Sequence, residues 1–309
     1  MGYMVDGVYH VGEDVTQTLP SGAWERQRST IRHWIEADHT AAFPAESGRY
    51  HLFVAWNCPW AHRTLLVRAV KGLQSDISVS VARPNRTDQG WVFDETGEFA
   101  DPLLGARAVH EVYSEDPSGY TGRLTVPVLW DTNTRRIVNN ESADISRMLN
   151  TAFRDHGPDL APAALIPDID AWNAKIYASL NNGVYRAGFA STQDAYESAA
   201  YEVFAALDEI ETHLTNSEWL CGDVLTEADL RLFPTLARFD VAYHYAFRCN
   251  LRKLTDYPAL WAYARRIYHV PGVADTVHFD VYKRGYFSAS EKRNPLGIIP
   301  IGPVSDWSA

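Results

Sequence analysis

The chain has 309 residues, of which 46% are hydrophobic and 22% are charged, and its formal net charge is −11. This composition is typical of a soluble globular protein, and the length predicts two domains. An acidic surface argues against a nucleic-acid partner, because binding to a phosphate backbone requires basic patches.

The three cysteines indicate a reducing compartment rather than a disulfide framework. Cys58, Cys221 and Cys249 lie far apart, and none forms a CxxC motif or a Cys/His metal spacing. We therefore expect no metal, and we expect Cys221 and Cys249 to be buried bystanders. No apolar run approaches the about 18 residues of a membrane span, and the N-terminus lacks the apolar core of a signal peptide. A cytoplasmic protein with no membrane partner is expected.

The first half of the chain predicts alternating strands and helices. Residues 1–45 are interpreted as an irregular extension that is ordered by its tryptophans. The apolar run 50–56 predicts a strand, the periodic stretch 61–73 a helix, and the alternating run 77–83 a second strand. Residues 84–122 form a polar insertion longer than a normal connection, and such loops are usually functional or disordered.

A hairpin and a helix complete this predicted domain. Residues 125–131 and 137–138 indicate two adjacent antiparallel strands. Pro127 makes the first an edge strand of the sheet, unless the peptide bond before this proline is special. A helix then begins within 140–144, where Ser142 can act as its cap and the free N–H groups form an anion site. The resulting β-α-β…β-β-α order is that of thioredoxin.

The second half is helical in pattern. A linker over 156–167 precedes four predicted helices, which cover 169–183, 193–215, 227–245 and 258–268. Thr226 and Asp229 have the spacing of a capping box at the start of the third helix. The tail is expected to be extended. The predicted domains are an extension (1–45), an α/β domain (46–157), an all-helical domain (158–278) and a tail (279–309) packed on both domains.

The motif Asn57-Cys58-Pro59-Trp60-Ala61-His62-Arg63 lies between the first predicted strand and helix. Pro59 suits the first helical turn, because its missing N–H would be unsatisfied there anyway. Cys58 then lies at the helix N-terminus, where free N–H groups and the helix dipole favour a thiolate. Ala61 replaces the second cysteine of a CxxC motif, so a mixed disulfide at Cys58 needs an external thiol. The alternative is that Cys58 is a small buried residue.

Five strings carry a resemblance to a known family: NCPWAHRTL, TVPVLWD, IVNNESADI, NNGVYRAGFA and KRGYF…NPLGIIP. Together they resemble the glutathionyl-hydroquinone reductases, also called xi-class glutathione transferases, over about residues 45–300. The first two strings also fit omega-class transferases, whereas the last two and the Trp91 insertion favour the xi class. The resemblance implies a thioredoxin-like domain followed by an all-α domain.

The resemblance also implies roles for individual residues around glutathione. Cys58 would be the nucleophile that takes up a glutathionyl group. Val126, before a cis proline, would offer its backbone to the cysteinyl part of glutathione. Glu141 and Ser142 would hold the γ-glutamyl end. Trp91 would stack against the tripeptide, and Arg123 would supply a nearby cation.

Tyrosines would line the pocket for the aromatic acceptor. The resemblance assigns this role to Tyr185 and Tyr286, with Tyr282 as an alternative to Tyr286; ordinary packing tyrosines are the competing interpretation. The family usually has His-Tyr-Tyr where this chain has Gly285-Tyr286-Phe287, so the third position lacks its hydroxyl.

The implied function is glutathione-dependent reduction of S-glutathionyl-hydroquinones to hydroquinones through a Cys58–glutathione mixed disulfide. Glutathione would be a co-substrate, the other partner a small quinone or hydroquinone, and the assembly a homodimer. One alternative is an omega-like thioltransferase or dehydroascorbate reductase that uses the same thiol without a hydroquinone pocket. Another is a non-enzymatic binding protein that kept the transferase fold.

Overall fold

The structure is a computed structural model that describes residues 2–12, 19, 21–291 and 293–308. The chain divides into two compact units. The first comprises Met1–Val15 and Arg28–Pro158, and the second comprises Thr16–Gln27 and Asp159–Ala309. The predicted 1–45 extension is therefore shared between the units.

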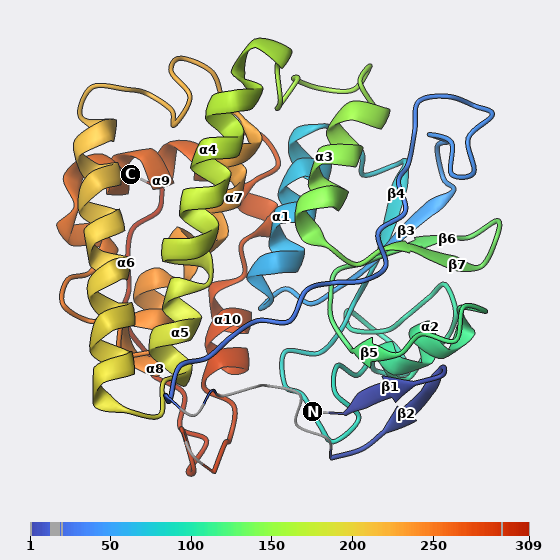
Figure 1. The fold of residues 1–309 in the computed structure, drawn as a ribbon, viewed down its shortest axis with the longest axis horizontal. Coiled ribbons are helices and arrows are strands. Elements are labelled where there is room, and N and C mark those ends of the chain that lie inside the picture. Colours follow the sequence, from blue (N-terminus) through green and yellow to red (C-terminus); the bar gives the residue numbers. More distant parts are fainter. Residues whose placement is uncertain (1, 13–18, 20, 292, 309) are drawn as a thin grey trace. The chain divides into compact units, whose positions relative to one another are not determined.

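A four-stranded sheet forms the centre of the first unit, in the order β4-β3-β6-β7. Strand β3 (Tyr50–Val54) pairs parallel with β4 (Ile77–Val81) and antiparallel with β6 (Val128–Asp131). Strand β7 (Arg136–Asn139) pairs antiparallel with β6. Helices α1 (Pro59–Val70) and α3 (Ser142–Ala152) pack against each other (Figure 1). This is the predicted thioredoxin order.

The Pro127 strand is not an edge strand, because β6 lies between β3 and β7, so the exception that the sequence left open, a special bond before the proline, applies here. Pro127 precedes the strand, which begins at Val128, and the Val126–Pro127 peptide bond is cis. The proline therefore occupies no position in the hydrogen-bonded ladder, which is where its missing N–H would interrupt the pairing.

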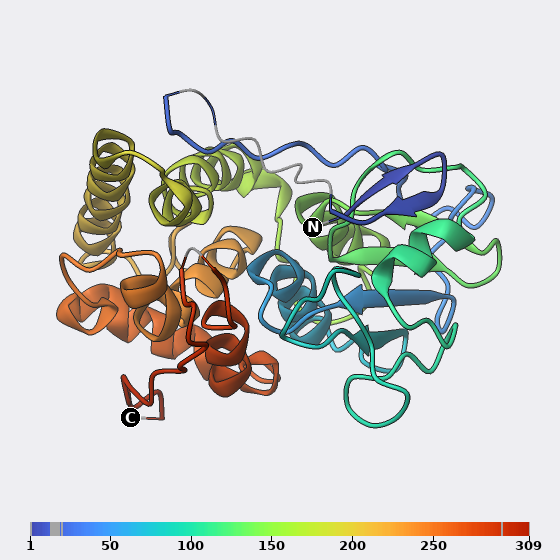
Figure 2. The same ribbon diagram turned by 90° about the horizontal axis from the view of Figure 1, so that it is seen from below.

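A second, small sheet corrects the prediction of an irregular N-terminal extension. Strands β1 (Tyr3–Val5) and β2 (Val8–His10) form a hairpin, and β1 also pairs with β5 (Gly122–Arg123). Asp6 and Gly7 both have positive φ angles, 49° and 78°. Such angles are required in a two-residue hairpin turn, for which Asp-Gly is a strong signal. Helix α2 (Val109–Glu115), from the long insertion, lies beside this hairpin (Figure 2).

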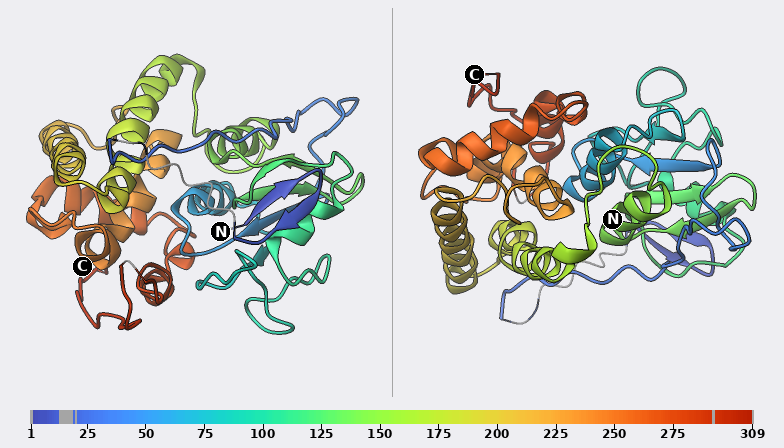
Figure 3. Two further views of the ribbon diagram at one scale, coloured as in Figure 1. Left: turned by 60° about the horizontal axis from the view of Figure 1, so that its bottom comes forward. Right: turned by 90° about the horizontal axis from the view of Figure 1, so that it is seen from above.

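Helices make up the second unit, and α5 and α6 lie side by side (Figure 3). The α-helices are α4 (Ile166–Ile176), α5 (Gly183–Phe189), α6 (Gln193–Leu214), α7 (Glu227–Arg238), α8 (His244–Ala246), α9 (Pro258–Tyr268) and α10 (Phe279–Tyr286). Short 3-10 turns cover Ala163–Leu165, Leu254–Asp256 and Ala274–Thr276. The predicted capping box of Thr226 and Asp229 is present at the start of α7.

Two π-helical turns lie within the predicted helices 169–183 and 227–245, and helix α5, which follows the first turn, was not predicted. Tyr177–Asn181 separates α4 from α5, and Phe239–Tyr243 separates α7 from α8. A π turn inserts one residue into the helical repeat, so it leaves an apolar periodic pattern almost unchanged, and such turns are frequent at functional sites.

The prediction of a wholly extended tail is wrong, since α10 begins the tail. Val281 and Tyr282 are buried on one side of this helix. Asp280 and Arg284 form an exposed ion pair one turn apart. This distribution is that of an amphipathic helix.

Candidate functional site

Cys58 is the N-cap residue of α1, with φ −81° and ψ 116°, and Pro59 occupies the first helical position. The Cys58 carbonyl accepts the first helical hydrogen bond, from the His62 N–H at 3.0 Å. The Cys58 side chain is only 8% exposed. The geometry thus confirms that the predicted thiol lies at the strand-to-helix junction.

The Cys58 thiol has a hydrogen-bond partner in Val126. The Cys58 Sγ donates to the Val126 carbonyl oxygen over 3.5 Å. Val126 comes directly before the cis Pro127 and β6, and it is buried. Two segments separated by the whole insertion therefore meet at the sulfur.

The N-terminus of α3 supplies the next group of predicted residues. Glu141, rather than Ser142, is the N-cap, and its carboxylate accepts from the Ala143 N–H at 3.2 Å. Ser142 is 3% exposed, and its hydroxyl is 3.4 Å from the Glu141 carboxylate and accepts from Arg63 Nη1 at 3.3 Å. The predicted serine cap is wrong because the longer Glu141 side chain reaches the free N–H and the hydroxyl has other partners.

Arg63 links the two helix N-termini. It lies one turn into α1 and is buried. Its guanidinium carbon is 4.2 Å from the centre of the Trp60 ring. Its hydrogen bond to Ser142 connects the cysteine helix with α3. A cation and two helix N-termini together favour an anionic group at this place.

Trp91 lies in the insertion, and Arg123 follows directly after it. Trp91 is 4% exposed; its carbonyl accepts from the Val109 N–H, and the Arg86 guanidinium lies 4.2 Å from its ring centre. Arg123 lies in β5, and its carbonyl accepts from the Tyr120 hydroxyl at 3.0 Å. These contacts do not test a role in binding, so binding of glutathione by Trp91 and Arg123 stays a prediction.

The predicted tyrosines meet in the second unit. The hydroxyls of Tyr185, on α5, and Tyr286, at the end of α10, are 2.8 Å apart. The Tyr286 hydroxyl is also 3.1 Å from that of Tyr243, a fully buried residue in the second π turn. Burial raises the pKa of Tyr243 and of Tyr286 well above the ordinary value. Both are therefore neutral hydrogen-bond donors at physiological pH.

A buried cation lies behind these hydroxyls. Arg238 is the last residue of α7; it is 0% exposed, and its Nη1 donates to the Pro234 carbonyl. Its guanidinium carbon lies 3.8 Å from the centre of the Tyr282 ring. Burial lowers the pKa of Arg238, but Tyr282, Tyr286, Tyr243 and Tyr185 raise it, and the net direction is upward. Tyr282 is fully buried beneath this cation.

Sequence reasoning missed Tyr243 and Arg238. A charged residue directly after the apolar run 232–237 was a signal for Arg238, since an arginine in an apolar helix face is seldom buried without a role. Tyr243 had no such signal, because the π turn shifts the direction of its side chain.

The other two cysteines are buried, as expected. Burial raises the pKa of Cys221, and it raises the pKa of Cys249 to about 12. Across the described part of the chain, no three or more His, Cys, Asp or Glu side chains are grouped so that they could hold a metal ion. No helix among the described residues has the length and apolar character needed to cross a membrane.

A thioredoxin-order unit with an N-cap cysteine, followed by a helical unit, defines a glutathione transferase. Family models for the N-terminal and C-terminal domains of glutathione S-transferases match residues 57–152 and 193–266. The chain therefore belongs to the glutathione S-transferase family, and the predicted fold class is confirmed.

Individual relatives show which glutathione transferases this chain is similar to. The chain is 46% identical to the glutathionyl-hydroquinone reductase PcpF of Sphingobium chlorophenolicum, over 98% of this chain and 97% of that protein. A xi-class transferase structure from Natrialba magadii is 41% identical, with a TM-score of 0.92, and covers 100% of this chain and 95% of its own. The glutathione-bound structure of YqjG, a glutathione transferase homolog from Escherichia coli K-12, is 44% identical, with a TM-score of 0.86, over 90% and 94% of the two chains. These matches confirm the family that the sequence motifs indicated.

Proposed function

We propose that the protein reduces S-glutathionyl-hydroquinones to hydroquinones, with glutathione as co-substrate. The observation that carries this proposal is the N-cap position of Cys58, whose Sγ lies 3.5 Å from the carbonyl of Val126. A relative that is 46% identical over 98% of this chain is named a glutathionyl-hydroquinone reductase, which supports the same substrate class.

The first step transfers the glutathionyl group to Cys58. A proton is added to the sulfur-bearing ring carbon while a ring hydroxyl loses its proton, which gives a keto tautomer of the substrate. The Cys58 thiolate then attacks the substrate sulfur, so the Cys58–S–S–glutathione bond forms and the carbon–sulfur bond breaks. The electron pair of that bond leaves with the ring as an enolate, which becomes the hydroquinone once its oxygen is protonated. An enolate is a far better leaving group than an aryl carbanion.

The second step restores the enzyme. The thiolate of a free glutathione attacks the mixed disulfide, releasing oxidised glutathione and the Cys58 thiolate. The two electrons gained by the ring thus come from two thiols, and substrate and co-substrate act in turn. Ala61 stands where a resolving cysteine would lie, so the second thiol comes from outside the motif.

The tyrosines are proposed donors to the ring oxygen on which charge develops. Tyr185 and Tyr286 share a hydrogen bond and have part-exposed side chains, and Tyr243 extends this chain of hydroxyls into the core. Neutral phenols placed where an oxyanion forms stabilise the transition state more than the ground state. Val126, Glu141, Ser142, Trp91 and Arg123 are proposed to bind glutathione.

The test measures the intact mass of the protein after incubation with glutathionyl-menadione and no added thiol. We expect a gain of one glutathionyl group, which added glutathione removes and which Cys58→Ala does not show. Labelling by oxidised glutathione but not by the thioether would instead support an omega-like thioltransferase. Absence of both labels would contradict a catalytic Cys58.

The assembly is proposed from the family resemblance, and the location is proposed from the three cysteines, which form no disulfide framework. We propose a cytoplasmic homodimer that acts on small molecules, with the domain bounds 46–157 and 158–278. Light scattering after gel filtration should give a mass near twice 34.7 kDa. A mass equal to that of one chain would contradict the dimer.

A further inference from the structure

A short N-terminal segment, residues 21–27, is held against α5 and α6 within the second unit (Figure 1). The Thr192 hydroxyl donates to the Ser21 carbonyl, and the Ser191 N–H donates to the Gly22 carbonyl, both over 3.2 Å. Gly22 has φ +81°, and a Cβ there would lie 2.7 Å from the Thr192 side chain. Only glycine permits this approach, so the segment has a fixed place beside the tyrosines of the acceptor site.

Trp24 extends the aromatic cluster from this segment. Its ring stacks on Tyr185, with centroids 6.0 Å apart and an interplanar angle of 28°. It also stacks on Phe189, at 5.7 Å and 24°. The Trp24 side chain is 5% exposed. Tyr185 therefore has Trp24 on one side and hydrogen-bonds to Tyr286 through its hydroxyl.

The indole N–H of Trp24 is a buried donor with no hydrogen-bond partner among the described residues. A buried tryptophan usually satisfies this group, because leaving a buried donor unpaired costs about 1–3 kcal/mol. A donor of this kind beside an aromatic acceptor site points to a ligand oxygen as its partner.

Arg26 adds a positive charge at the same place. Its guanidinium carbon lies 5.0 Å from the centre of the Trp24 ring and 5.1 Å from that of Tyr185. The Arg26 Nε donates to the Asn182 side-chain oxygen at 3.0 Å. This hydrogen bond holds the guanidinium group next to the start of α5. A guanidinium and an N–H group together match the two oxygens of a carboxylate.

We propose that Trp24 and Arg26 form a subsite for an acidic ring substituent, so that the enzyme prefers glutathionyl-hydroquinones whose ring carries a carboxylate. The Trp24 Nε1–H donates to one carboxylate oxygen, and Arg26 supplies the compensating charge. This specificity rests on the proposed function, because the same tyrosines are the proposed donors to the ring.

A matched pair of substrates tests the subsite. The glutathionyl adduct of 2,5-dihydroxybenzoate carries the carboxylate, and the adduct of its methyl ester has nearly the same shape without the charge. The readout is the ratio of kcat/KM for the acid to kcat/KM for the ester. We expect Trp24→Phe, which keeps a ring but removes the N–H, and Arg26→Gln each to lower this ratio about 10-fold.

The control variant is Arg28→Gln, which removes an exposed cation two residues further along and should leave the ratio unchanged. Added salt should lower the ratio of the wild type, since it screens the Arg26 charge. An equal loss on both substrates would show that Trp24 only packs against Tyr185, and that result overturns the subsite. An unchanged ratio in both variants overturns it as well.

A binding measurement separates the subsite from the proposed reaction. Free 2,5-dihydroxybenzoate is titrated into the wild-type protein while the indole N–H resonances are followed by NMR, with Trp24→Phe assigning the Trp24 signal. We expect this signal to shift downfield on binding, and to shift less with the methyl ester. No change of the Trp24 signal at millimolar ligand would reject the subsite, even if the thioether reaction itself is confirmed.

Discussion

Arg238 places a positive charge in the interior of the second unit, next to four tyrosines. Its guanidinium lies against the Tyr282 ring, and Tyr286 is one turn further along the same helix. Burial raises the pKa of Tyr286, and the charge of Arg238 acts in the opposite direction. In the proposed reaction, this cation would help the linked hydroxyls to stabilise the negative charge that develops on the ring oxygen of the substrate.

Substitution of Arg238 should lower the rate of the thioether reaction, and more so when the positive charge is lost. We expect Arg238→Met to lower the single-turnover rate of Cys58 glutathionylation from glutathionyl-menadione about 100-fold, the size of effect seen when a transition-state donor is removed. Arg238→Lys keeps the charge and should lose about 10-fold.

Two controls accompany this measurement. The rate of Cys58 glutathionylation from oxidised glutathione should stay unchanged in both variants, because that reaction needs no ring donor. Thermal melting establishes that each variant is folded at the assay temperature. Equal losses in the Met and Lys variants would show that the charge of Arg238 has no role in the reaction.

His51 gives a pH-dependent contribution to stability. It lies on β3, 1% exposed, with its ring nitrogens 2.6 Å and 2.8 Å from the hydroxyls of Ser78 and Ser80. Burial lowers the pKa of His51 from 6.5 to about 4. The folded state therefore binds this proton less readily than the unfolded chain. The contribution is complete above the unfolded pKa and is lost as the pH falls towards the folded one.

We expect this residue to lower the free energy of unfolding by about 2 kcal/mol between about pH 7 and pH 5. Urea unfolding at several pH values, compared between wild type and His51→Gln, isolates the contribution from other titrating groups. The variant should lose about 2 kcal/mol less than the wild type over this interval. Parallel curves would mean that His51 titrates alike in the folded and unfolded states.

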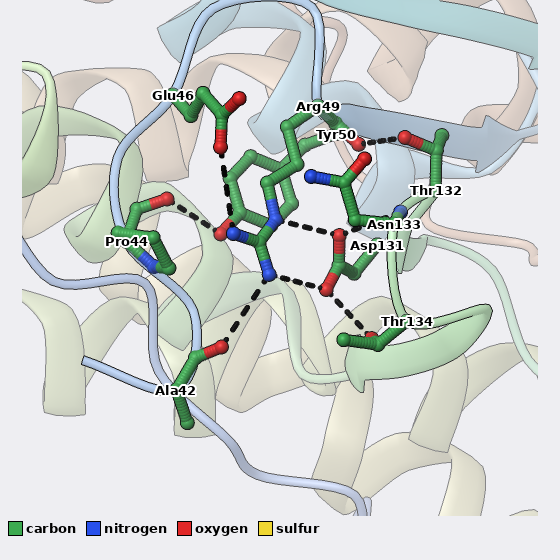
Figure 4. A network of polar contacts seen from close by, with 9 residues as sticks. All are labelled: Ala42, Pro44, Glu46, Arg49, Tyr50, Asp131, Thr132, Asn133 and Thr134. Atoms are coloured by element: carbon green, nitrogen blue, oxygen red, sulfur yellow. Dashed lines mark hydrogen bonds and ion pairs between the residues drawn. The ribbon is translucent and has the colours of Figure 1, made fainter. Parts of the chain in front are cut away.

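At the scale of elements, one buried ion pair joins the start of β3 to the β6–β7 turn (Figure 4). Arg49 donates from Nε and Nη2 to the two Asp131 oxygens, each over 2.7 Å. The carboxylate also accepts from the Asn133 N–H and the Thr134 hydroxyl. Burial raises the pKa of Asp131, but these partners outweigh it and hold the pKa below its usual value.

Removing one partner should cost far more here than at the surface. Asp131 is 0% exposed and Arg49 9%, so Asp131→Ala leaves a buried guanidinium without its carboxylate and should destabilise the protein by about 3 kcal/mol. Glu95→Ala breaks the ion pair between Glu95 and Arg107, whose side chains are 75% and 62% exposed, and should leave the free energy of unfolding almost unchanged. Urea unfolding compares the two. Equal costs would contradict the structural role of the buried pair.

Local signals made the central sheet of the first unit and its helices α1 and α3 predictable. The Cys-Pro junction fixed the start of α1 at Pro59, and the Asp131–Arg136 turn indicated the β6–β7 hairpin. The Asp6-Gly7 turn carried an equally local signal that was overlooked. The π turns were harder to predict, because a one-residue insertion barely alters an apolar pattern. Helix α10 was also harder to predict, because its polar face gives the mixed polarity that is typical of an extended tail.

Within the site, the sequence located residues whose role depends on their own segment. Cys58 needs only its helix N-terminus, and Tyr185 and Tyr286 were identified through the family motifs. The proposed roles of Arg238, Tyr243 and Trp24 depend on contacts with residues from other segments. Such tertiary contacts leave no periodic trace in the sequence.

At the scale of the whole molecule, the predicted site residues are divided between the two units. Cys58, Val126, Glu141 and Ser142 belong to the first, and the tyrosines belong to the second. Within the first unit, contacts through Val126 and Arg63 connect the cysteine to β6 and α3. The proposed glutathione site in the first unit and the proposed ring site in the second can therefore be tested separately, each with its own ligand.

Hydrogen exchange should report this division directly. A ligand stabilises the groups that it holds by RT ln(1 + [L]/Kd), about 2.7 kcal/mol at 100 times its Kd. Glutathione should therefore slow amide exchange most in the first turns of α1 and α3 and at the start of β6, where the predicted ligands lie. A free hydroquinone should instead slow exchange in α5, α10 and residues 239–243. If glutathione protected α5 and α10 but left the starts of α1 and α3 unchanged, the assignment of the thiol site to the first unit would be wrong. The same result would then require a different partner for Cys58, because its helix N-terminus would hold no part of the tripeptide.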